Sequence, residues 1–351
     1  MHKLKNSKLL VTGGAGFIGS NLIEYFLAND NEVVCLDDLS TGHRKNIVGF
    51  LDNPNFQMLE GDIRDLDTCK TAVRDCEYIF HQAALGSVPR SIKDPVTTNA
   101  VNIDGFLNML TAARDEGVKR FIYAASSSTY GDSKELPKME ERIGRPLSPY
   151  AITKVVNEYF AKVYSEIYGL ETIGLRYFNV FGRRQDPNGA YAAVIPLWVK
   201  RLIEHQSPVI NGDGSYSRDF TYIDNVIQAN ELAATTPRHE ILESLDKYYV
   251  QLKKAEKLDI DPPTTIMDIF NVASGGRTTL LELFETLRCH LSQYDPEIAQ
   301  VEVTIGPKRQ GDIPHSLASV DKAKLVLGYD PQYDASQGFE VACAWYYENL
   351  K

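Results

Sequence analysis

The amino-acid sequence predicts a doubly wound α/β fold, in which helices cover both faces of a parallel sheet. Short β-branched and aromatic runs alternate with longer amphipathic segments through the first half of the chain, and a glycine-rich turn follows the first run. The 351 residues leave room for a second, smaller domain. The expected strands are Lys8–Thr12, Glu32–Asp37, Asn55–Leu59, Tyr78–His81, Arg120–Ser126, Thr172–Arg176 and Ile266–Ala273.

Apolar spacing places helices between these runs, and the regular alternation ends after about Tyr177. We expect a nucleotide-binding domain over residues 1–178, with later returns near 220–236 and 266–273. A smaller C-terminal α/β substrate-binding domain then comprises 179–219 and 274–351. Residues 239–263 are rich in charge and predict an insertion of one helix and a linker, without evident chemistry. The expected helices include Asn102–Glu116, Tyr150–Tyr168, Asp224–Ala234 and Thr279–Ser292.

Composition restricts the partners. The formal charge of −10 argues against nucleic acid, because phosphate binding needs clustered Lys and Arg. The five cysteines are widely spaced and form no C-x-x-C pair, so we expect reduced thiols and no metal site. No secretory leader and no apolar run of membrane-spanning length is present, which predicts a cytoplasmic protein without a membrane partner.

The glycine-rich turn has the spacing of a phosphate-binding site. Gly13 allows a tight turn, Gly16 lets the backbone approach a pyrophosphate, and Gly19 lets the following helix pack closely on the sheet. The helix begins near Phe17 and Ile18, whose free N–H groups face the anion.

An acidic residue at the end of the second strand selects the cofactor. Asp37 lies 18 residues beyond Gly19, where a carboxylate accepts hydrogen bonds from the adenosine ribose and repels a 2′-phosphate. The sequence therefore predicts NAD rather than NADP in a Rossmann-type sheet. Asp62, at the end of the third strand, is a further candidate for the adenine side, although a solvated turn explains it nearly as well.

A second motif predicts acid–base chemistry. Ser148 can cap a helix in which Pro149 fits the first turn, and Tyr150 and Lys154 then share one helical face. A nearby ammonium stabilises a phenolate, so we expect a lowered pKa for Tyr150. Ser126, at the end of the fifth strand, supplies a hydroxyl that can hydrogen-bond the same substrate oxygen.

These motifs together resemble the extended short-chain dehydrogenase/reductases over essentially the whole chain, and more narrowly the UDP-N-acetylglucosamine and UDP-galactose 4-epimerases. The resemblance implies a tightly held NAD, a catalytic triad of Ser126, Tyr150 and Lys154, and a homodimer that pairs helices 102–116 and 150–168. It also implies that Ala83, Ala84 and Asn102 line the cofactor.

The residue that follows the catalytic serine separates related sugar chemistries. Dehydratases and decarboxylases of this family carry a carboxylate there, whereas this chain has Ser127 and Ser128, which cannot move a C5 proton. Ser127 remains a candidate substrate contact. The resemblance assigns the diphosphate and uridine to Asn179, Arg218, Arg309 and Asp312, and a 2-acetamido group to the surroundings of Gly86, Ser87, Asn179, Gln185 and the small Ser316.

The expected activity is NAD-dependent 4-epimerisation of UDP-N-acetylhexosamines through a transient 4-keto sugar, with UDP-glucose and UDP-galactose as further substrates. A 4-epimerase of UDP-hexuronic acids is an alternative within the family. Outside it, a catalytically silent NAD-binding regulator and a net reductase stay open; the complete triad disfavours the first and Asp37 the second.

Overall fold

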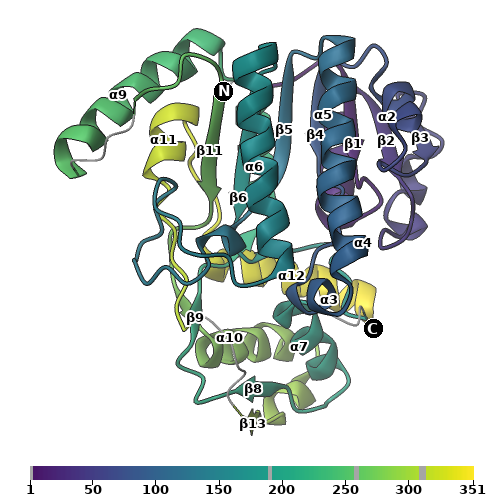
Figure 1. Ribbon diagram of the computed structural model, residues 1–351. Helices are drawn as coiled ribbons and strands as arrows, with labels where there is room; N and C mark the ends of the chain where they lie inside the picture. The colour runs from purple at the N-terminus through teal and green to yellow at the C-terminus, as the bar shows by residue number, and fades with distance from the viewer. Residues whose placement is uncertain (1–2, 189–191, 257–260, 308–313) are drawn as a thin grey trace.

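The computed structural model describes residues 3–188, 192–256, 261–307 and 314–351, and its centre is a seven-stranded parallel sheet (Figure 1). The strand order is β3-β2-β1-β4-β5-β6-β11. The chain builds outward from β1 in one direction and from β4 in the other, which confirms the doubly wound fold. The strands are β1 (Lys8–Thr12), β2 (Glu32–Asp37), β3 (Phe56–Glu60), β4 (Tyr78–His81), β5 (Arg120–Ser126), β6 (Thr172–Tyr177) and β11 (Met267–Val272).

Helices cover both faces of this sheet. Helices α2 (Leu66–Val73), α5 (Gly105–Glu116) and α6 (Pro149–Tyr168) bury one face, and α1 (Phe17–Leu27) and α8 (Ile223–Thr235) bury the other. The inner strands are therefore buried on both sides, which explains their nearly continuous apolar sequences. None of the described helices has both the length and the apolar composition that a membrane span requires.

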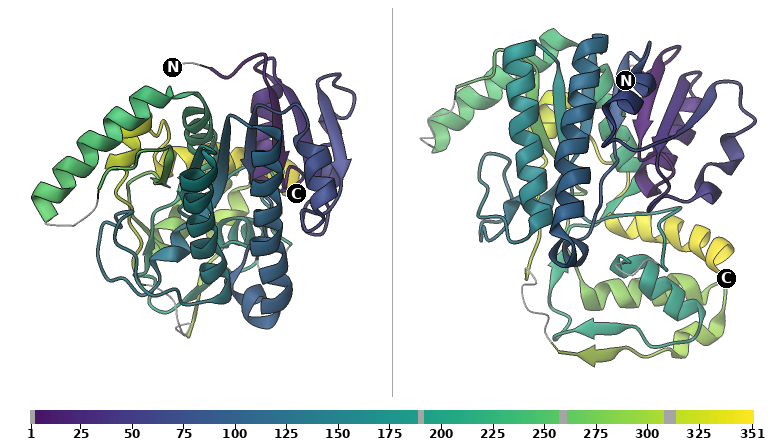
Figure 2. Two further views of the ribbon diagram at one scale, coloured as in Figure 1. Left: turned by 45° about the horizontal axis from the view of Figure 1, so that its top comes forward. Right: turned by 45° about the vertical axis from the view of Figure 1, so that its right-hand side comes forward.

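A smaller lobe lies beyond the carboxyl ends of the strands (Figure 2). Its core forms between α7 (Val194–Ile203), α10 (Leu280–Ser292) and α12 (Ala335–Leu350), and β8 (Val209–Asn211) pairs in parallel with β13 (Thr304–Gly306). Shorter elements connect the lobe to the sheet. They are α3 (Val88–Lys93), α4 (Pro95–Asn99), β7 (Val180–Phe181), β9 (Ser217–Arg218), β10 (Thr221–Tyr222) and β12 (Thr278–Thr279).

The charged insertion forms helix α9 (Arg238–Glu256), which projects from the upper left of the molecule in Figure 1 and packs on α11 (Asp321–Leu327). One stripe of α9 is buried, and the rest of its described surface is mostly polar. The buried stripe consists of Ile241, Leu245, Tyr249 and Leu252.

A buried ionic network attaches α9 to the rest of the fold. Lys322 of α11 donates to Asp268 Oδ1 at 2.6 Å, to Glu141 Oε1 at 3.0 Å and to the Tyr249 hydroxyl at 2.8 Å. Tyr248 of α9 donates to the other oxygen of Glu141 at 3.1 Å. Two adjacent tyrosines thus dock the inserted helix against groups contributed by β11, α11 and the loop before α6.

Candidate functional site

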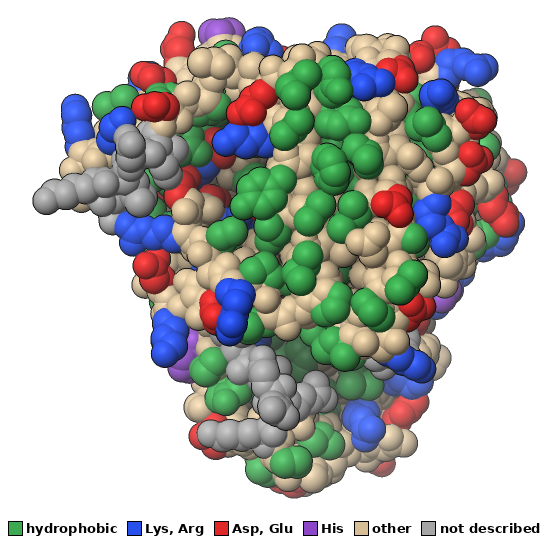
Figure 3. Space-filling model, in the orientation of Figure 1, with side chains coloured by type: hydrophobic (Ala, Val, Ile, Leu, Met, Phe, Trp, Pro, Cys, Tyr) green, Lys and Arg blue, Asp and Glu red, His purple; other side chains and the backbone are tan. Residues whose placement is uncertain are grey.

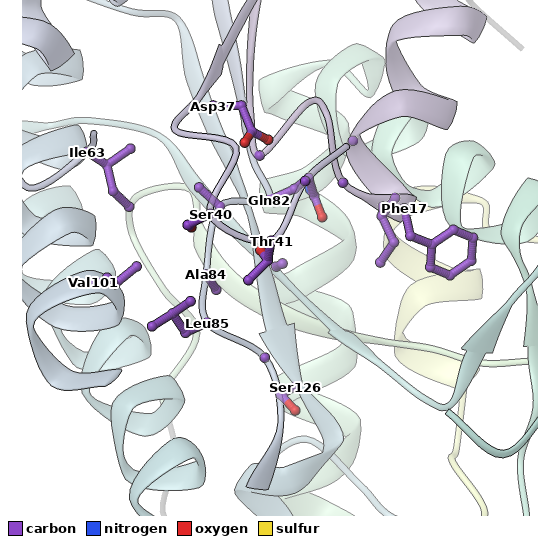
Figure 4. A pocket seen from close by; sticks show the side chains of 18 of the residues that line it. Phe17, Asp37, Ser40, Thr41, Ile63, Gln82, Ala84, Leu85, Val101 and Ser126 are labelled. Atoms are coloured by element: carbon purple, nitrogen blue, oxygen red, sulfur yellow. The ribbon is translucent and has the colours of Figure 1, made fainter. Parts of the chain in front are cut away.

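A cavity of about 420 Å³ opens at the carboxyl ends of the strands, where the order reverses between β1 and β4. The loops after β1, β2, β3 and β4 line it, together with the end of β5 and the start of α6. Figure 4 shows Asp37 at one end of this space and Ser126 at the opposite end. Ligands of open α/β sheets bind in such a crevice.

The glycine-rich turn brings backbone to the edge of the cavity. Gly13 has φ +66°, and a β-carbon there would lie 2.7 Å from the amide nitrogen of Ala83. A β-carbon on Gly19 would lie 2.2 Å from the Gly13 carbonyl oxygen. Gly16 is the N-cap of α1 without a side-chain hydrogen bond, so the first turn presents its N–H groups to the cavity.

Phe17 and Ile18, the two residues after Gly16, also line the cavity, although their side chains are apolar. Ile18 and Phe17 belong to the first turn of α1. Figure 4 shows the Phe17 ring turned away from the loop that carries Ser40 and Thr41. Of these two residues, the groups suited to bind an anion are therefore the backbone N–H groups.

Asp37 ends β2 as predicted and is buried at the cavity wall. Its carboxylate accepts from the backbone N–H groups of Ala15 at 2.9 Å and Leu39 at 2.8 Å. Burial raises the pKa of this carboxyl, and the two backbone donors oppose that shift. A β-carbon on Gly42 would lie 2.9 Å from both carboxylate oxygens, so the loop after β2 must pass close to Asp37 with glycine at that position.

The other residues predicted at the cofactor divide into two groups. Ala83, Ala84 and Asp62 line the cavity, and Asp62 is held by Arg64, whose backbone N–H and Nε both donate at 2.8 Å. Asn102 does not line the cavity. It is buried and holds the backbone of Leu85, since its Oδ1 accepts from the Leu85 N–H at 2.8 Å. Asn102 thus shapes the cavity wall through a neighbour.

Helix α6 carries the predicted acid–base pair into the cavity. Ser148 caps the helix as expected, its hydroxyl accepting from the Ala151 N–H at 3.1 Å. Tyr150 and Lys154 both line the cavity, and the Lys154 Nζ lies 5.9 Å from the centroid of the Tyr150 ring. Lys154 donates to the Ala124 carbonyl of β5 at 2.7 Å, which fixes its position relative to the end of that strand.

Ser126 is arranged to donate. Its hydroxyl oxygen accepts from the Ser128 N–H at 3.1 Å and from the Ser128 hydroxyl at 2.9 Å. Because both acceptor positions are used, the Ser126 proton is available for donation toward Tyr150, whose pKa the Ser126 side chain lowers. Ser127 starts a 3₁₀ turn (Ser127–Tyr130) and is not among the residues that line the cavity.

The pKa values of the site differ from the expectation. Burial raises the pKa of Tyr150, and the Ser126 side chain, which lowers it, only partly offsets this effect. Burial also lowers the pKa of Lys154 to about 8. The expected lowering of the Tyr150 pKa is therefore absent, because desolvation of the phenol dominates and the ammonium is directed toward the Ala124 carbonyl.

Five polar residues of the cavity lining were not among the predicted site residues: Asp38, Ser40, Thr41, Gln82 and Tyr177. Gln82 has a buried Oε1 atom with no hydrogen-bond partner among the described residues, so a ligand with a donor group fits there. Tyr177 also lines the cavity, and its hydroxyl accepts from Asn230 Nδ2 at 2.9 Å. All five lie at or after the end of a strand, which was the signal in the sequence: Asp38, Ser40 and Thr41 follow β2, Gln82 comes directly after β4, and Tyr177 is the last residue of β6.

The residues predicted around the sugar are only partly brought together. Gly86 and Asn179 line the cavity. Ser87 does not; it has φ 106° and caps α3, its hydroxyl accepting from the Arg90 N–H at 3.2 Å. Gln185 also lies outside the lining and binds protein groups, since its Nε2 donates to the Val180 carbonyl at 3.1 Å.

Arg218 and Ser316 lie close together in the smaller lobe, outside the cavity lining. Arg218 Nη1 donates to the Ser217 carbonyl at 3.0 Å, and the Ser316 N–H donates to the same carbonyl at 3.0 Å. The predicted anchors Arg309 and Asp312 fall outside the described residues.

The glycine turn, the Asp37 carboxylate and the unpartnered Gln82 oxygen make a site that fits NAD. A crystal structure of a UDP-glucose 4-epimerase from Thermus thermophilus in complex with NAD is 30% identical, with a TM-score of 0.78 over 97% of this chain and 98% of that one. A UDP-glucuronic acid 4-epimerase from Bacillus cereus, solved with UDP-glucuronic acid and NAD, is 27% identical, with a TM-score of 0.78 over 97% and 99% of the two chains.

Two further comparisons cover nearly all of the chain. A UDP-N-acetylglucosamine 4-epimerase from Methanobrevibacter ruminantium in complex with UDP-N-acetylmuramic acid is 34% identical, with a TM-score of 0.82 over 98% of this chain and 99% of that one. The UDP-glucose 4-epimerase of Mycolicibacterium smegmatis is 33% identical over 94% of this chain and 96% of its own. The model of the NAD-dependent epimerase/dehydratase family matches residues 9–243. The chain therefore belongs to the NAD-dependent epimerase/dehydratase family, within the extended short-chain dehydrogenase/reductases, and its cofactor is NAD.

Proposed function

We propose that the protein interconverts UDP-N-acetylglucosamine and UDP-N-acetylgalactosamine by inverting the configuration at C4, and that it also accepts UDP-glucose and UDP-galactose. The observation that carries this proposal is that Tyr150 and Lys154 line the same cavity as Ser126, with Lys154 bound to the Ala124 carbonyl of β5. Ser126 lies at the end of the cavity opposite Asp37 (Figure 4). A sugar placed between Tyr150, Ser126 and Lys154 meets a base, a hydroxyl donor and a cation together.

Each side chain has a distinct task in this mechanism. Tyr150 removes the proton of the sugar 4-hydroxyl, and Ser126 stabilises the same oxygen with the proton that its contacts to Ser128 leave available. Lys154, whose Nζ lies 5.9 Å from the centroid of the Tyr150 ring, would hold the ribose of the bound cofactor. When bound, NAD supplies reversible hydride transfer at C4. Return of the hydrogen to the opposite face of a turned 4-keto sugar gives the epimer.

The distribution of acids supports epimerisation over elimination. Among the residues that the structure describes, the carboxylates that line the cavity are Asp37, Asp38 and Asp62, which lie at or just beyond the ends of β2 and β3. A dehydratase needs an additional acid or base at the sugar, and Ser127 and Ser128 cannot serve as one.

The preference for an acetylated sugar rests on side-chain size. Ser316 is small, and its N–H and the Arg218 guanidinium donate to the same Ser217 carbonyl; we propose that the 2-acetamido group lies beside Ser316 and the diphosphate beside Arg218. We propose that Gly86 and Asn179 form the facing wall, both being cavity residues. The relative of known structure named for UDP-N-acetylglucosamine supports the same reading.

The test is the substitution Tyr150→Phe, which removes the phenol oxygen and keeps the ring. We expect interconversion of the two acetylated sugars to fall by about 100-fold or more, while UDP affinity and NAD content stay at the wild-type level. Tyr294→Phe removes an exposed hydroxyl far along the chain and serves as the matched control. Retained turnover in Tyr150→Phe excludes Tyr150 as the base.

A substrate panel separates this proposal from its rivals. Chromatography of products from UDP-N-acetylglucosamine, UDP-glucose and UDP-glucuronic acid identifies the inverted sugar directly. Inversion of UDP-glucuronic acid alone would favour the hexuronate alternative, which the Bacillus cereus structure represents. Stoichiometric consumption of a reduced cofactor would instead identify a reductase, and absence of turnover on every sugar nucleotide would favour a regulator.

We further propose that the protein is a homodimer through α6 and its neighbours. Figure 3 shows a broad apolar area on the face formed by α5 and α6, with few charged side chains inside it. The exposed apolar residues that α6 contributes are Ile152, Tyr159, Val163, Ile167 and Tyr168. A contiguous apolar area of this kind on a folded protein marks a protein–protein interface.

Light scattering tests the dimer. Ile167 is 67% exposed near the C-terminal end of α6, and Ile167→Glu places a charge within the proposed interface, so a monomer is expected. Ile305 is 61% exposed on β13 in the other lobe, and Ile305→Glu is expected to leave the dimer intact. A monomeric wild type contradicts the proposal.

A further inference from the structure

Asp219 occupies an unusual place between the two halves of the molecule. It follows β9 directly, it is fully buried, and it is not among the residues that line the cavity. Burial of an ionised carboxylate costs several kcal/mol unless donors surround it. The donors around Asp219 therefore indicate what the buried charge is for.

Three donors from two distant segments converge on the carboxylate. Oδ1 accepts from the Ser274 N–H at 3.1 Å and from the Ser274 hydroxyl at 3.0 Å, directly after β11. Oδ2 accepts from the Ala318 N–H at 3.2 Å. Each oxygen holds a different part of the chain, so the carboxylate joins the end of the sheet to the segment that contains Ser316.

The backbone of Asp219 makes a third connection. Its carbonyl accepts from Asn179 Nδ2 at 3.0 Å. Asn179 has φ 35°, a left-handed conformation that a residue other than glycine adopts at some cost and that this bond helps to hold. Asn179 lines the cavity, so Asp219 reaches the cavity wall through it.

The neighbours of Asp219 complete the arrangement. Arg218 precedes it in the chain, and the Arg218 guanidinium donates to the Pro314 carbonyl at 3.3 Å as well as to Ser217. Ser316 donates to Ser217 and lies two residues before the Ala318 N–H that Asp219 accepts. Asp219 is thus connected to three residues proposed to bind the nucleotide sugar: to the Ser316 segment through its carboxylate, to Asn179 through its backbone carbonyl, and to Arg218 as its neighbour in the chain.

We infer that Asp219 is a positioning residue for the nucleotide-sugar site, acting through Asn179, Arg218 and the Ser316 segment without touching substrate itself. The identity of the ligand, a sugar linked to uridine diphosphate, rests on the proposed function. An amide cannot replace the carboxylate, because an Asn side chain offers one acceptor oxygen and would point its NH₂ group at either the Ser274 donors or the Ala318 N–H. Either the hydrogen bonds from Ser274 or the hydrogen bond from Ala318 must then be lost.

The experiment compares Asp219→Asn with an isosteric control in the same part of the fold. Asn225 is buried on α8 and fastens the chain before α12, since its Nδ2 donates to the Tyr333 carbonyl at 2.7 Å and its Oδ1 accepts from the Tyr333 N–H at 3.1 Å. Asn225→Asp removes the hydrogen bond from Nδ2 to the Tyr333 carbonyl and leaves the contacts of Asn179, Arg218 and Ser316 in place. It therefore measures how a loss of stability alone changes UDP affinity.

For Asp219→Asn we expect the Kd for UDP, measured by calorimetry, and the KM for the sugar nucleotide to rise about tenfold, equivalent to 1.4 kcal/mol. The kcat should stay within about twofold and the NAD content should be unchanged, because Tyr150, Ser126 and Lys154 belong to other elements. Ser274→Ala, which removes one of the three donors, should weaken UDP binding in the same direction by a smaller factor. This second variant keeps the test available if Asp219→Asn does not fold.

Two results would overturn the inference: unchanged UDP affinity in folded Asp219→Asn together with unchanged affinity in Ser274→Ala, or an equal loss of affinity in Asn225→Asp. Failure of the proposed function gives a different pattern. A wild type that binds UDP but inverts none of the acetylated sugars refutes the activity, while the comparison of UDP affinities still supports or refutes the role of Asp219.

Discussion

Gly19 offers a quantitative test of the cofactor turn, because a single methyl group there meets only backbone. A β-carbon at this position would lie 2.2 Å from the Gly13 carbonyl oxygen and 2.7 Å from the Gly14 Cα. Ordinary contacts between such atoms are about 3.5 Å, so the turn or the helix must move by about 1 Å. Neither obstructing atom belongs to a side chain that could rotate away.

Opposing effects set the expected size of the change. Alanine is favoured over glycine inside a helix by about 1 kcal/mol, whereas forcing an additional carbon into a packed site costs about 1–3 kcal/mol. We expect Gly19→Ala to lower the free energy of unfolding of the NAD-free protein by about 1–2 kcal/mol. A shift of about 1 Å in the turn should weaken NAD binding by about 100-fold, since such displacements at a site have effects of this order.

Urea unfolding of the NAD-free protein measures the first effect, and chromatography of NAD released by acid from the purified protein measures the second. Gly49→Ala is the matched control, because a β-carbon at Gly49 meets nothing within 4 Å. The control should keep wild-type stability and NAD content. If Gly19→Ala retains one NAD per chain and unfolds at the wild-type urea concentration, the steric argument for the turn is refuted.

Further predictions concern buried charge and cofactor choice. Burial raises the pKa of Glu140 from its ordinary 4.5 to about 7, so the free energy of unfolding falls as pH rises from about 4.5 through 7. Glu140→Gln cannot ionise. In urea unfolding it should therefore lose less stability than wild type between pH 5 and pH 8. Lys322→Met leaves the carboxylates of Asp268 and Glu141 without their cation and should cost about 3–5 kcal/mol by the same measurement; a loss under 1 kcal/mol would contradict the network. Asp37→Ser should lower NAD retention and admit NADP, which cofactor extraction after incubation with both would reveal; continued exclusion of NADP would contradict the role of Asp37.

The sheet could be predicted because its strands are buried on both faces and end in recognisable residues. The bounds of β1, β2, β4 and β5 agree with the sequence prediction, and Ser148 marks the start of α6 through its cap. Helix α5 was predicted from Asn102, but the chain forms a wide π turn over Ala100–Asp104 and α5 begins at Gly105. Apolar periodicity continues through such a turn, so the pattern alone could not reveal it.

Contacts between distant segments account for most of what the sequence could not supply. The docking of α9 depends on Lys322 reaching Asp268, 54 residues away, and Tyr249, 73 residues away. Asp219 likewise meets Ala318 across 99 residues. No local pattern specifies such pairs. The predicted lowering of the Tyr150 pKa was wrong for a related reason. The sequence shows the Lys154 ammonium one helical turn along, but it does not show the desolvation of the phenol or the Ala124 carbonyl that orients Lys154.

The place where α9 joins the fold has a practical consequence. Helix α9 follows α8 in the chain and precedes β11. Strand β11 starts at the end of the sheet opposite the cofactor crevice. A fluorescent reporter or an immobilisation tether attached on the outward side of this helix would therefore sit a full strand length from the chemistry. Such a fusion should let the enzyme be captured on a support while its crevice stays open to sugar nucleotides.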